Sequence, residues 1–292
     1  MLSAFLIIQG VFMPSPVLNR SNATCSVADY PRVKLVKNPD AENGVGRSIL
    51  KFFNSSEAVF RMGQLMDKLP KWGNEVRESL GMGRYAPMDT LSSKGLTAWT
   101  WGTTFLRIPQ VIDEAVQENE ATRLAISNDA LTGAQVDRQI AKSASATTEA
   151  VSMACHGASM TAGLFPQTAL LSKMFTATAE TVGLAHDAIE FGLHKKNLEL
   201  AYSMDLAGAT SEMKEAVQQT KDNNWIAVAK DVCSVFSGIF GFLCAVTGLS
   251  FLSNLTAATL SLGSTAFAVT RKIHEMNMSY KPINFVDARL LV

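Results

Sequence analysis

Three residues that can bind metals or protons recur at four-residue steps in one segment. His186, Glu190 and His194 would share one face of a helix, because residues four apart lie on the same side. Such a face can coordinate a metal when a second helix adds ligands. No second ligand-bearing segment can be named, and Glu190 with His194 also makes an ordinary i,i+4 surface pair. We therefore predict a surface pair and no metal, and a metal-dependent helical enzyme is the less favoured alternative.

Other reactive side chains also lack suitable spacing. Cys155 and His156 are adjacent, so on a helix they point about 100° apart and do not form a nucleophile and its base. The four cysteines include no C-x-x-C pair. The Gly81-x-Gly83 motif lacks the third glycine and the preceding strand of a dinucleotide site. We predict no catalytic, cofactor-binding or metal-binding residue, and therefore a protein that is not an enzyme.

The composition limits the classes of partner. Of the 292 residues, 47% are hydrophobic and 18% are charged, and 26 basic side chains balance 26 acidic ones. Nucleic-acid binding normally needs a basic excess. We therefore predict no nucleic-acid partner.

One long run of the chain carries no charge. From Val232 to Thr270 there are 39 residues without Asp, Glu, Lys, Arg or His. About 20 apolar residues cross a bilayer core as a helix, so the run is long enough for two short spans. We predict a membrane-inserted helical hairpin. The side chains expected to span the bilayer are Val235, Phe236, Ile239, Phe240, Leu243, Leu255, Leu262 and Val269.

The middle and the ends of this run predict its topology. The turn is expected at 250–254, where a serine and an asparagine can cap the second helix. Lys230 precedes the run, and Arg271 and Lys272 follow it. Both ends should therefore stay on one side of the membrane, which the positive-inside rule identifies as the cytosol.

A second interpretation of the run remains open. Apolar and small residues recur at alternating three- and four-residue steps from Leu255 to Met276, which is typical of a helix buried on one face. The opposite face carries serines, alanines and Lys272, which water tolerates. The run could therefore also supply the last helices of a soluble bundle.

The rest of the chain has a helical pattern from about residue 48 onward. Pro70 should close or bend the first helix. Long helices are expected at 135–164 and 168–206, followed by a short polar helix at 211–220 and a break at 221–224. The sequence thus predicts an all-α protein, with long helices in a bundle or in antiparallel hairpins and a C-terminal hydrophobic helical hairpin.

Four regions follow from these patterns. They are a loosely ordered N-terminal arm at 1–45, a helical region at 46–224, the hydrophobic helical hairpin at 225–276 and a C-terminal tail at 277–292. The arm starts with an apolar patch, Met1 to Met13, that has neither a preceding basic residue nor a clear cleavage site. A conventional signal peptide is not the favoured interpretation of it.

The two-lobed hydropathy of the uncharged run, 232–249 followed by 252–270, resembles the bilobed hydrophobic domain of chlamydial inclusion-membrane proteins. The resemblance covers about one-sixth of the chain. It implies a type III secreted bacterial protein in the membrane of a host vacuole. It also implies that the helical parts face the host cytosol and bind host proteins.

These patterns predict a membrane-associated helical interaction or scaffold protein. Its expected partners are membrane lipid, proteins bound by the helical region, and further copies of the chain. The alternative is a soluble helical-bundle interaction protein without membrane insertion.

Overall fold

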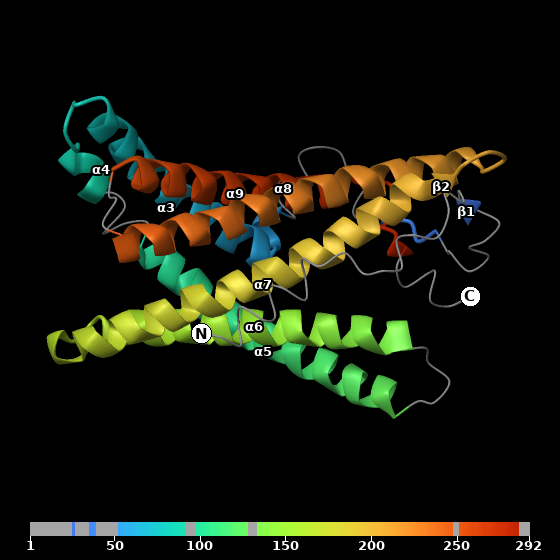
Figure 1. The fold of residues 1–292 in the computed structure, drawn as a ribbon, viewed down its shortest axis with the longest axis horizontal. Helices are drawn as coiled ribbons and strands as arrows, with labels where there is room; N and C mark the ends of the chain where they lie inside the picture. The colour runs from blue at the N-terminus through green and yellow to red at the C-terminus, as the bar shows by residue number, and fades with distance from the viewer. Residues whose placement is uncertain are drawn as a thin grey trace.

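Long antiparallel helices make up most of the protein, which confirms the predicted all-α fold (Figure 1). A computed structural model describes residues 25–26, 35–38, 52–90, 97–127, 133–247 and 251–285. The helices are α3 (Ser56–Ser79), α4 (Ala86–Thr90), α5 (Thr97–Ile126), α6 (Gly133–Ala162), α7 (Ala169–Ser203), α8 (Ser211–Thr247) and α9 (Phe251–Asn277). A 3-10 turn, Pro166–Thr168, precedes α7.

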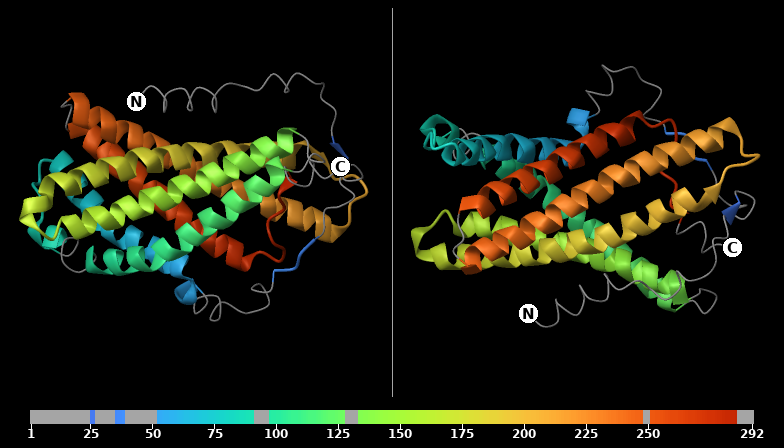
Figure 2. Two further views of the ribbon diagram at one scale, coloured as in Figure 1. Left: turned by 90° about the horizontal axis from the view of Figure 1, so that it is seen from below. Right: turned by 45° about the horizontal axis from the view of Figure 1, so that its top comes forward.

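Six long helices of the described chain close into a ring. Each of α5, α6, α7 and α8 packs on the helix that follows it, because short connections make consecutive helices antiparallel neighbours. The ring is completed by α3, which packs on both α9 and α5. The views in Figure 2 show α3 and the α8–α9 pair opposite the α5–α6 pair.

Two helices continue through a proline, so Pro70 does not close the first helix, which was one of the two effects predicted for it. α3 runs on to Ser79, and α5 contains Pro109. Beyond Pro70, the Trp72 indole N–H donates to Thr259 of α9 at 3.0 Å. Packing against α9 on this side stabilises the helix despite the backbone hydrogen bond that a proline removes.

The helix α8 is continuous, whereas the sequence predicted a break at 221–224. The two asparagines of that segment are buried and bonded: Asn223 donates to Glu275 Oε1 at 3.3 Å, and Asn224 donates to the Thr220 carbonyl at 2.8 Å. Because both side-chain NH2 groups are bonded inside the protein, these residues do not interrupt the helix. α8 therefore crosses the boundary at 224 between two predicted regions.

α8 and α9 pack against each other as a helical hairpin, but they do not form the long apolar hairpin that the sequence predicted at 225–276. The connection between them is shorter than predicted: α9 begins at Phe251, so most of the segment 250–254 belongs to the helix. Within the described residues, no helix is long and apolar enough to cross a membrane.

Apolar burial is divided among three small clusters. One joins α3, α5 and α6 around Phe60 and Val111, and one joins the start of α3 to α9 around Ala58 and Val269. The third seats Phe285, which is fully buried, against α7 and α8. Part of the predicted C-terminal tail is thus core.

The described parts of the predicted N-terminal arm are also attached to the helices. The strand β1 (Cys25–Ser26) pairs in parallel with β2 (Met204–Asp205), with Cys25 opposite Met204. Asn38 donates its amide N–H to the Met278 carbonyl at 2.9 Å. These contacts hold both ends of the described chain on the same part of the ring.

Candidate functional site

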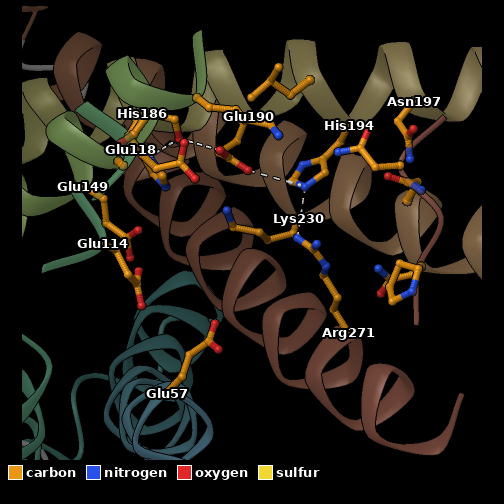
Figure 3. A pocket seen from close by; sticks show the side chains of 18 of the residues that line it. Glu57, Glu114, Glu118, Glu149, His186, Glu190, His194, Asn197, Lys230 and Arg271 are labelled. Atoms are coloured by element: carbon orange, nitrogen blue, oxygen red, sulfur yellow. Dashed lines mark hydrogen bonds and ion pairs between the residues drawn. The ribbon is translucent and has the colours of Figure 1, made fainter. Parts of the chain in front are cut away.

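A central cavity of about 600 Å³ lies inside the ring, and all six long helices line it (Figure 3). Small-ligand sites have similar volumes but mostly apolar walls, whereas this cavity is lined by charges of both signs. Its charged or titratable residues include Glu57 and Arg61 of α3, Arg107 and Glu118 of α5, Glu149 of α6, His186, Glu190 and His194 of α7, Lys230 of α8 and Arg271 of α9.

The three residues predicted to share a helix face all lie at this cavity. Glu190 Oε2 is 3.4 Å from His194 Nε2, which is the expected i,i+4 contact. The prediction of a surface pair is nevertheless wrong, because the two side chains are only 24% and 13% exposed. α7 lies between α6 and α8 in the ring, and this arrangement turns the face of His186, Glu190 and His194 inward.

His186 and Glu190 are both bound by Ser145 of α6. The Ser145 hydroxyl donates to Glu190, and His186 Nδ1 lies 3.0 Å from the Ser145 carbonyl oxygen. A carbonyl oxygen only accepts, so Nδ1 carries the proton and donates to it. The imidazole nitrogen nearest the serine is therefore not a base, and the arrangement does not activate a nucleophile.

His194 has different partners. Its Nδ1 lies 2.8 Å from Asp231 Oδ2 of α8, and its Nε2 lies 3.2 Å from Arg271 Nη1 of α9. Within the described part of the chain, no three His, Cys, Asp or Glu side chains are grouped to hold a metal ion. Around His194, the lone pair that a metal would need is taken by the guanidinium.

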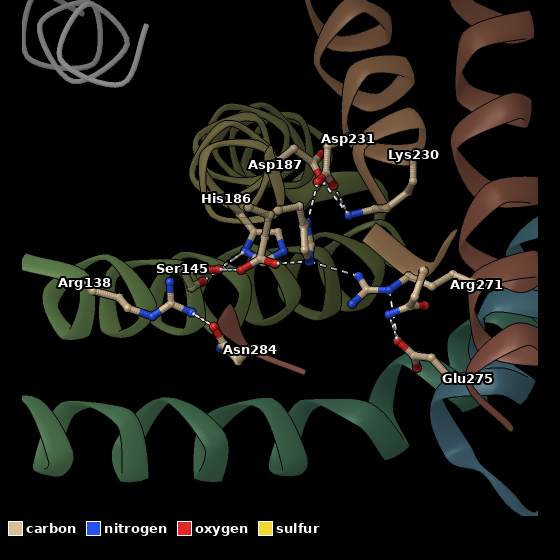
Figure 4. A network of polar contacts seen from close by, with 12 residues as sticks. Arg138, Ser145, His186, Asp187, Lys230, Asp231, Arg271, Glu275 and Asn284 are labelled. Atoms are coloured by element: carbon tan, nitrogen blue, oxygen red, sulfur yellow. Dashed lines mark hydrogen bonds and ion pairs between the residues drawn. The ribbon is translucent and has the colours of Figure 1, made fainter. Parts of the chain in front are cut away.

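Asp231 and Lys230 form a buried charged pair at the base of the hairpin (Figure 4). Asp231 is fully buried and accepts from Lys230 Nζ at 2.8 Å, and Lys230 also donates to Asp187 at 3.2 Å. Burial alone would lower the pKa of Lys230, but the carboxylates of Asp187 and Asp231 raise it above its ordinary value. This lysine therefore stays charged inside the protein.

The other two cations that flank the uncharged run are paired as well. Arg271 donates to Glu275 at 3.0 Å, and Lys272 donates to Glu57 of α3 at 2.8 Å. The predicted topology used these side chains as charges that remain in water, whereas here they tie the base of the hairpin to α3 and α7.

The eight predicted spanning residues differ in their surroundings. Phe236 and Ile239 are exposed, at 49% and 40%, and Val269 is buried. The half-buried ones are Val235, Phe240, Leu255 and Leu262. Leu243 lies outside the residues whose side chains the structure describes.

A second nearly uncharged segment was missed. Between Glu149 and Glu180 the only Asp, Glu, Lys, Arg or His residues are His156 and Lys173. This segment forms the end of α6 and the start of α7, where Leu170 is 72% exposed. A search for long segments with few charged residues would have found it, because such a search does not require a continuous apolar run.

Comparisons of the chain with protein-family models, with curated proteins and with solved structures find no match.

Proposed function

We propose that the protein is a membrane-associated helical interaction protein, which enters a bilayer with the end of the ring where α8 meets α9. The observation that carries the proposal is the position of the two nearly uncharged segments. The end of α8 and the start of α9 lie at the same end of the molecule as the junction of α6 with α7 (Figures 1 and 2). We call this end the apolar end.

Large apolar side chains are exposed at the apolar end. Leu164, Phe165, Leu170 and Met174 are each more than half exposed at the α6–α7 junction, and Phe236 is 49% exposed on α8. Grouped apolar side chains on a surface are typical of sites that contact a membrane or another protein. Shallow insertion of such helix ends buries apolar area in the interfacial region and does not require a spanning helix.

Lipid is the first partner in this proposal, and proteins are the second. α5 carries an exposed apolar face that includes Phe105, Ile112 and Val116, at helical spacings of seven and four. Such a face suits a helix of a partner protein or of another copy of the chain. The two-lobed hydropathy of 232–270 supports the vacuole membrane of an intracellular bacterium as the location.

A helical-bundle interaction protein without membrane insertion is the second candidate. Polar side chains of the uncharged run support it, because they bond inside the ring. Ser234 donates to Asp187 at 2.5 Å, and Thr265 Oγ1 accepts from Lys68 of α3 at 2.7 Å. These hydrogen bonds attach the uncharged run to α7 and α3 in the closed ring.

Substitution of one exposed residue by arginine separates the two candidates. Ile239 is 40% exposed on α8 within the uncharged run, and Trp225 is 58% exposed on the same helix outside it. An arginine in the hydrocarbon core costs about 2.5 to 3.5 kcal/mol, and less near the interface. Ile239→Arg should therefore weaken flotation with phosphatidylcholine vesicles about tenfold or more, while Trp225→Arg should not.

Both substitutions add one positive charge to an exposed site of α8, so their effects on solubility and charge are matched. Flotation is measured at neutral and at acidic pH. Equal binding of the two variants, or no vesicle binding by the unmodified protein at either pH, would favour the second candidate.

A further inference from the structure

We infer that His194 is a pH-sensitive clasp that bonds the base of the α8–α9 hairpin to α7 when its imidazole is neutral and loses its bond to the α9 arm when it is protonated. The inference rests on the proposed function, since the hairpin that His194 bonds is the one proposed to enter a membrane.

The position of His194 is the first step. Asp231 is the residue immediately before the uncharged run, and Arg271 is the residue immediately after it. His194 contacts both, through Nδ1 at 2.8 Å and Nε2 at 3.2 Å. One side chain of α7 therefore holds both arms of the hairpin at their base.

The donor and acceptor chemistry gives the proton state. A guanidinium has only N–H donors, so His194 Nε2 must offer a lone pair to Arg271. The single ring proton is then on Nδ1, where it is donated to Asp231. The observed contacts thus belong to a neutral imidazole with the proton on Nδ1.

Protonation changes one of these two contacts. A second proton, taken from solvent, binds Nε2 and removes the lone pair that Arg271 uses. The new N–H faces Glu190 Oε2, which lies 3.4 Å away on the same helix. The contact with Asp231 remains and becomes an ion pair, so α8 stays on α7 while α9 loses its bond to α7.

Neighbouring groups are arranged to accept this change. Burial alone would raise the pKa of Glu190, but the charge of a protonated His194 lowers it, and so does the hydrogen bond from the Ser145 hydroxyl, so the carboxylate is ionised when it receives the new N–H. Arg271 keeps Glu275 as a partner at 3.0 Å.

The charged groups around the clasp are Asp187 and Glu190 on α7, Lys230 and Asp231 on α8, and Arg271 and Glu275 on α9. Those across the cavity are Glu57 and Arg61 on α3, Arg107, Glu114 and Glu118 on α5, and Arg138, Lys142 and Glu149 on α6.

The clasp can be tested without a membrane. Nitrogen NMR of the full chain, recorded at a neutral and at an acidic pH, should show His194 protonated on Nδ1 only while α9 is bonded to α7, and on both nitrogens once that bond is lost. Amide hydrogen exchange in α9, corrected for the intrinsic effect of pH, should become about tenfold faster at the lower pH, the factor expected for loss of one hydrogen bond from a charged group.

Two variants assign this response to the clasp. Glutamine gains no proton in this range, so His194→Gln should remove the difference in α9 exchange between the two pH values. His274→Gln is the matched control, because His274 also lies on α9 but faces the Gln219 carbonyl at 3.4 Å, outside the clasp. It should keep the wild-type response. In the Arg271→Gln variant, the amide hydrogens of α9 should exchange rapidly at both pH values.

A proton on Nε2 at neutral pH in the unmodified protein would overturn the inference, and this result does not depend on the folding of any variant. A pH response of α9 that persists in His194→Gln would overturn it as well. If the clasp opens as expected but vesicles are not bound at either pH, the proposed function fails and the clasp stands. If vesicles are bound but hydrogen exchange in α9 does not change with pH, the clasp is contradicted and the proposed function stands.

Discussion

At the scale of residues, the interior of the ring is a set of charges that neutralise one another. Asp231 is fully buried between Lys230 and His194, Lys230 reaches Asp187 of α7 at 3.2 Å, and Arg107 reaches Glu149 of α6 at 3.7 Å. Buried ion pairs add little to stability compared with apolar packing, but removal of one partner leaves an uncompensated charge. These pairs therefore fix which helices meet more than they strengthen the fold.

Glu57 gives a pH-dependent prediction. Burial alone would raise the pKa of Glu57, but the positive charges of Arg61, Lys272 and Arg107 lower it from 4.5 to about 2. An acid whose pKa is lowered by folding stabilises the fold fully above its unfolded pKa, and this contribution is lost as the pH falls through the folded value. Glu57→Gln should therefore reduce the free energy of unfolding above pH 4.5, with a difference that shrinks toward pH 2.

Denaturant unfolding at several pH values measures this difference. Glu120→Gln is the control, because Glu120 is an exposed carboxylate on α5. It should change stability little throughout. A Glu57→Gln effect that grows as the pH falls has the opposite sign and would contradict the assigned ion pairs.

Sequence reasoning found some of these residues but not their partners. The spacing of His186, Glu190 and His194 correctly placed them on one face of a helix. Their partners Ser145 and Asp231 are 41 and 37 residues away from the histidines they contact, on other helices. A spacing rule along one helix contains no information on such contacts.

At the scale of elements, one close approach sets how α3 crosses α5. A Cβ added at Gly63 would lie 2.5 Å from Cδ1 of Trp99, whereas one added at Gly102 would meet nothing within 4 Å. Gly102→Ala should raise stability by about 0.5 to 1 kcal/mol, since alanine has the higher helix propensity. Gly63→Ala should be less stable than Gly102→Ala by about 1 to 3 kcal/mol, because the Trp99 ring must move.

Chemical unfolding of the two alanine variants measures the comparison, with the unmodified protein as reference. The pair is matched because each change adds one methyl group to a helical glycine. Equal stability of the two variants would show that the indole moves at no cost and that Gly63 does not determine the approach of α3 to α5.

The long middle helices could be predicted because their patterns are strong. The expected helices at 135–164 and 168–206 correspond to Gly133–Ala162 and Ala169–Ser203. The first helix does not end at Pro70, and the break predicted in the asparagine-rich segment of α8 is absent, because distant contacts stabilise the backbone at both places. Local propensity is overridden where such contacts are available.

At the scale of the whole molecule, charged side chains line the interior of the ring and the two nearly uncharged segments lie together at one end of it. The closed ring was not predicted, because it depends on α3 packing on both α5 and α9, and the α3–α9 contacts join residues as far as 215 apart in the sequence. The uncharged run itself was visible in the sequence. Its placement beside the α6–α7 junction was not, and that placement is what supports entry by one end of the ring.

Depth measurement in a bilayer tests this central claim most directly. Fluorescent probes are attached to single cysteines in a chain whose native cysteines are replaced. The sites are Leu170 and Ile239 at the apolar end, and Leu124 near the C-terminal end of α5; all three side chains are exposed. The protein is bound to vesicles that carry a quencher on their acyl chains. The account predicts quenching at Leu170 and Ile239 and none at Leu124. Bound protein with quenching at Leu124 alone, or with no quenching at either of the other two sites, would contradict it.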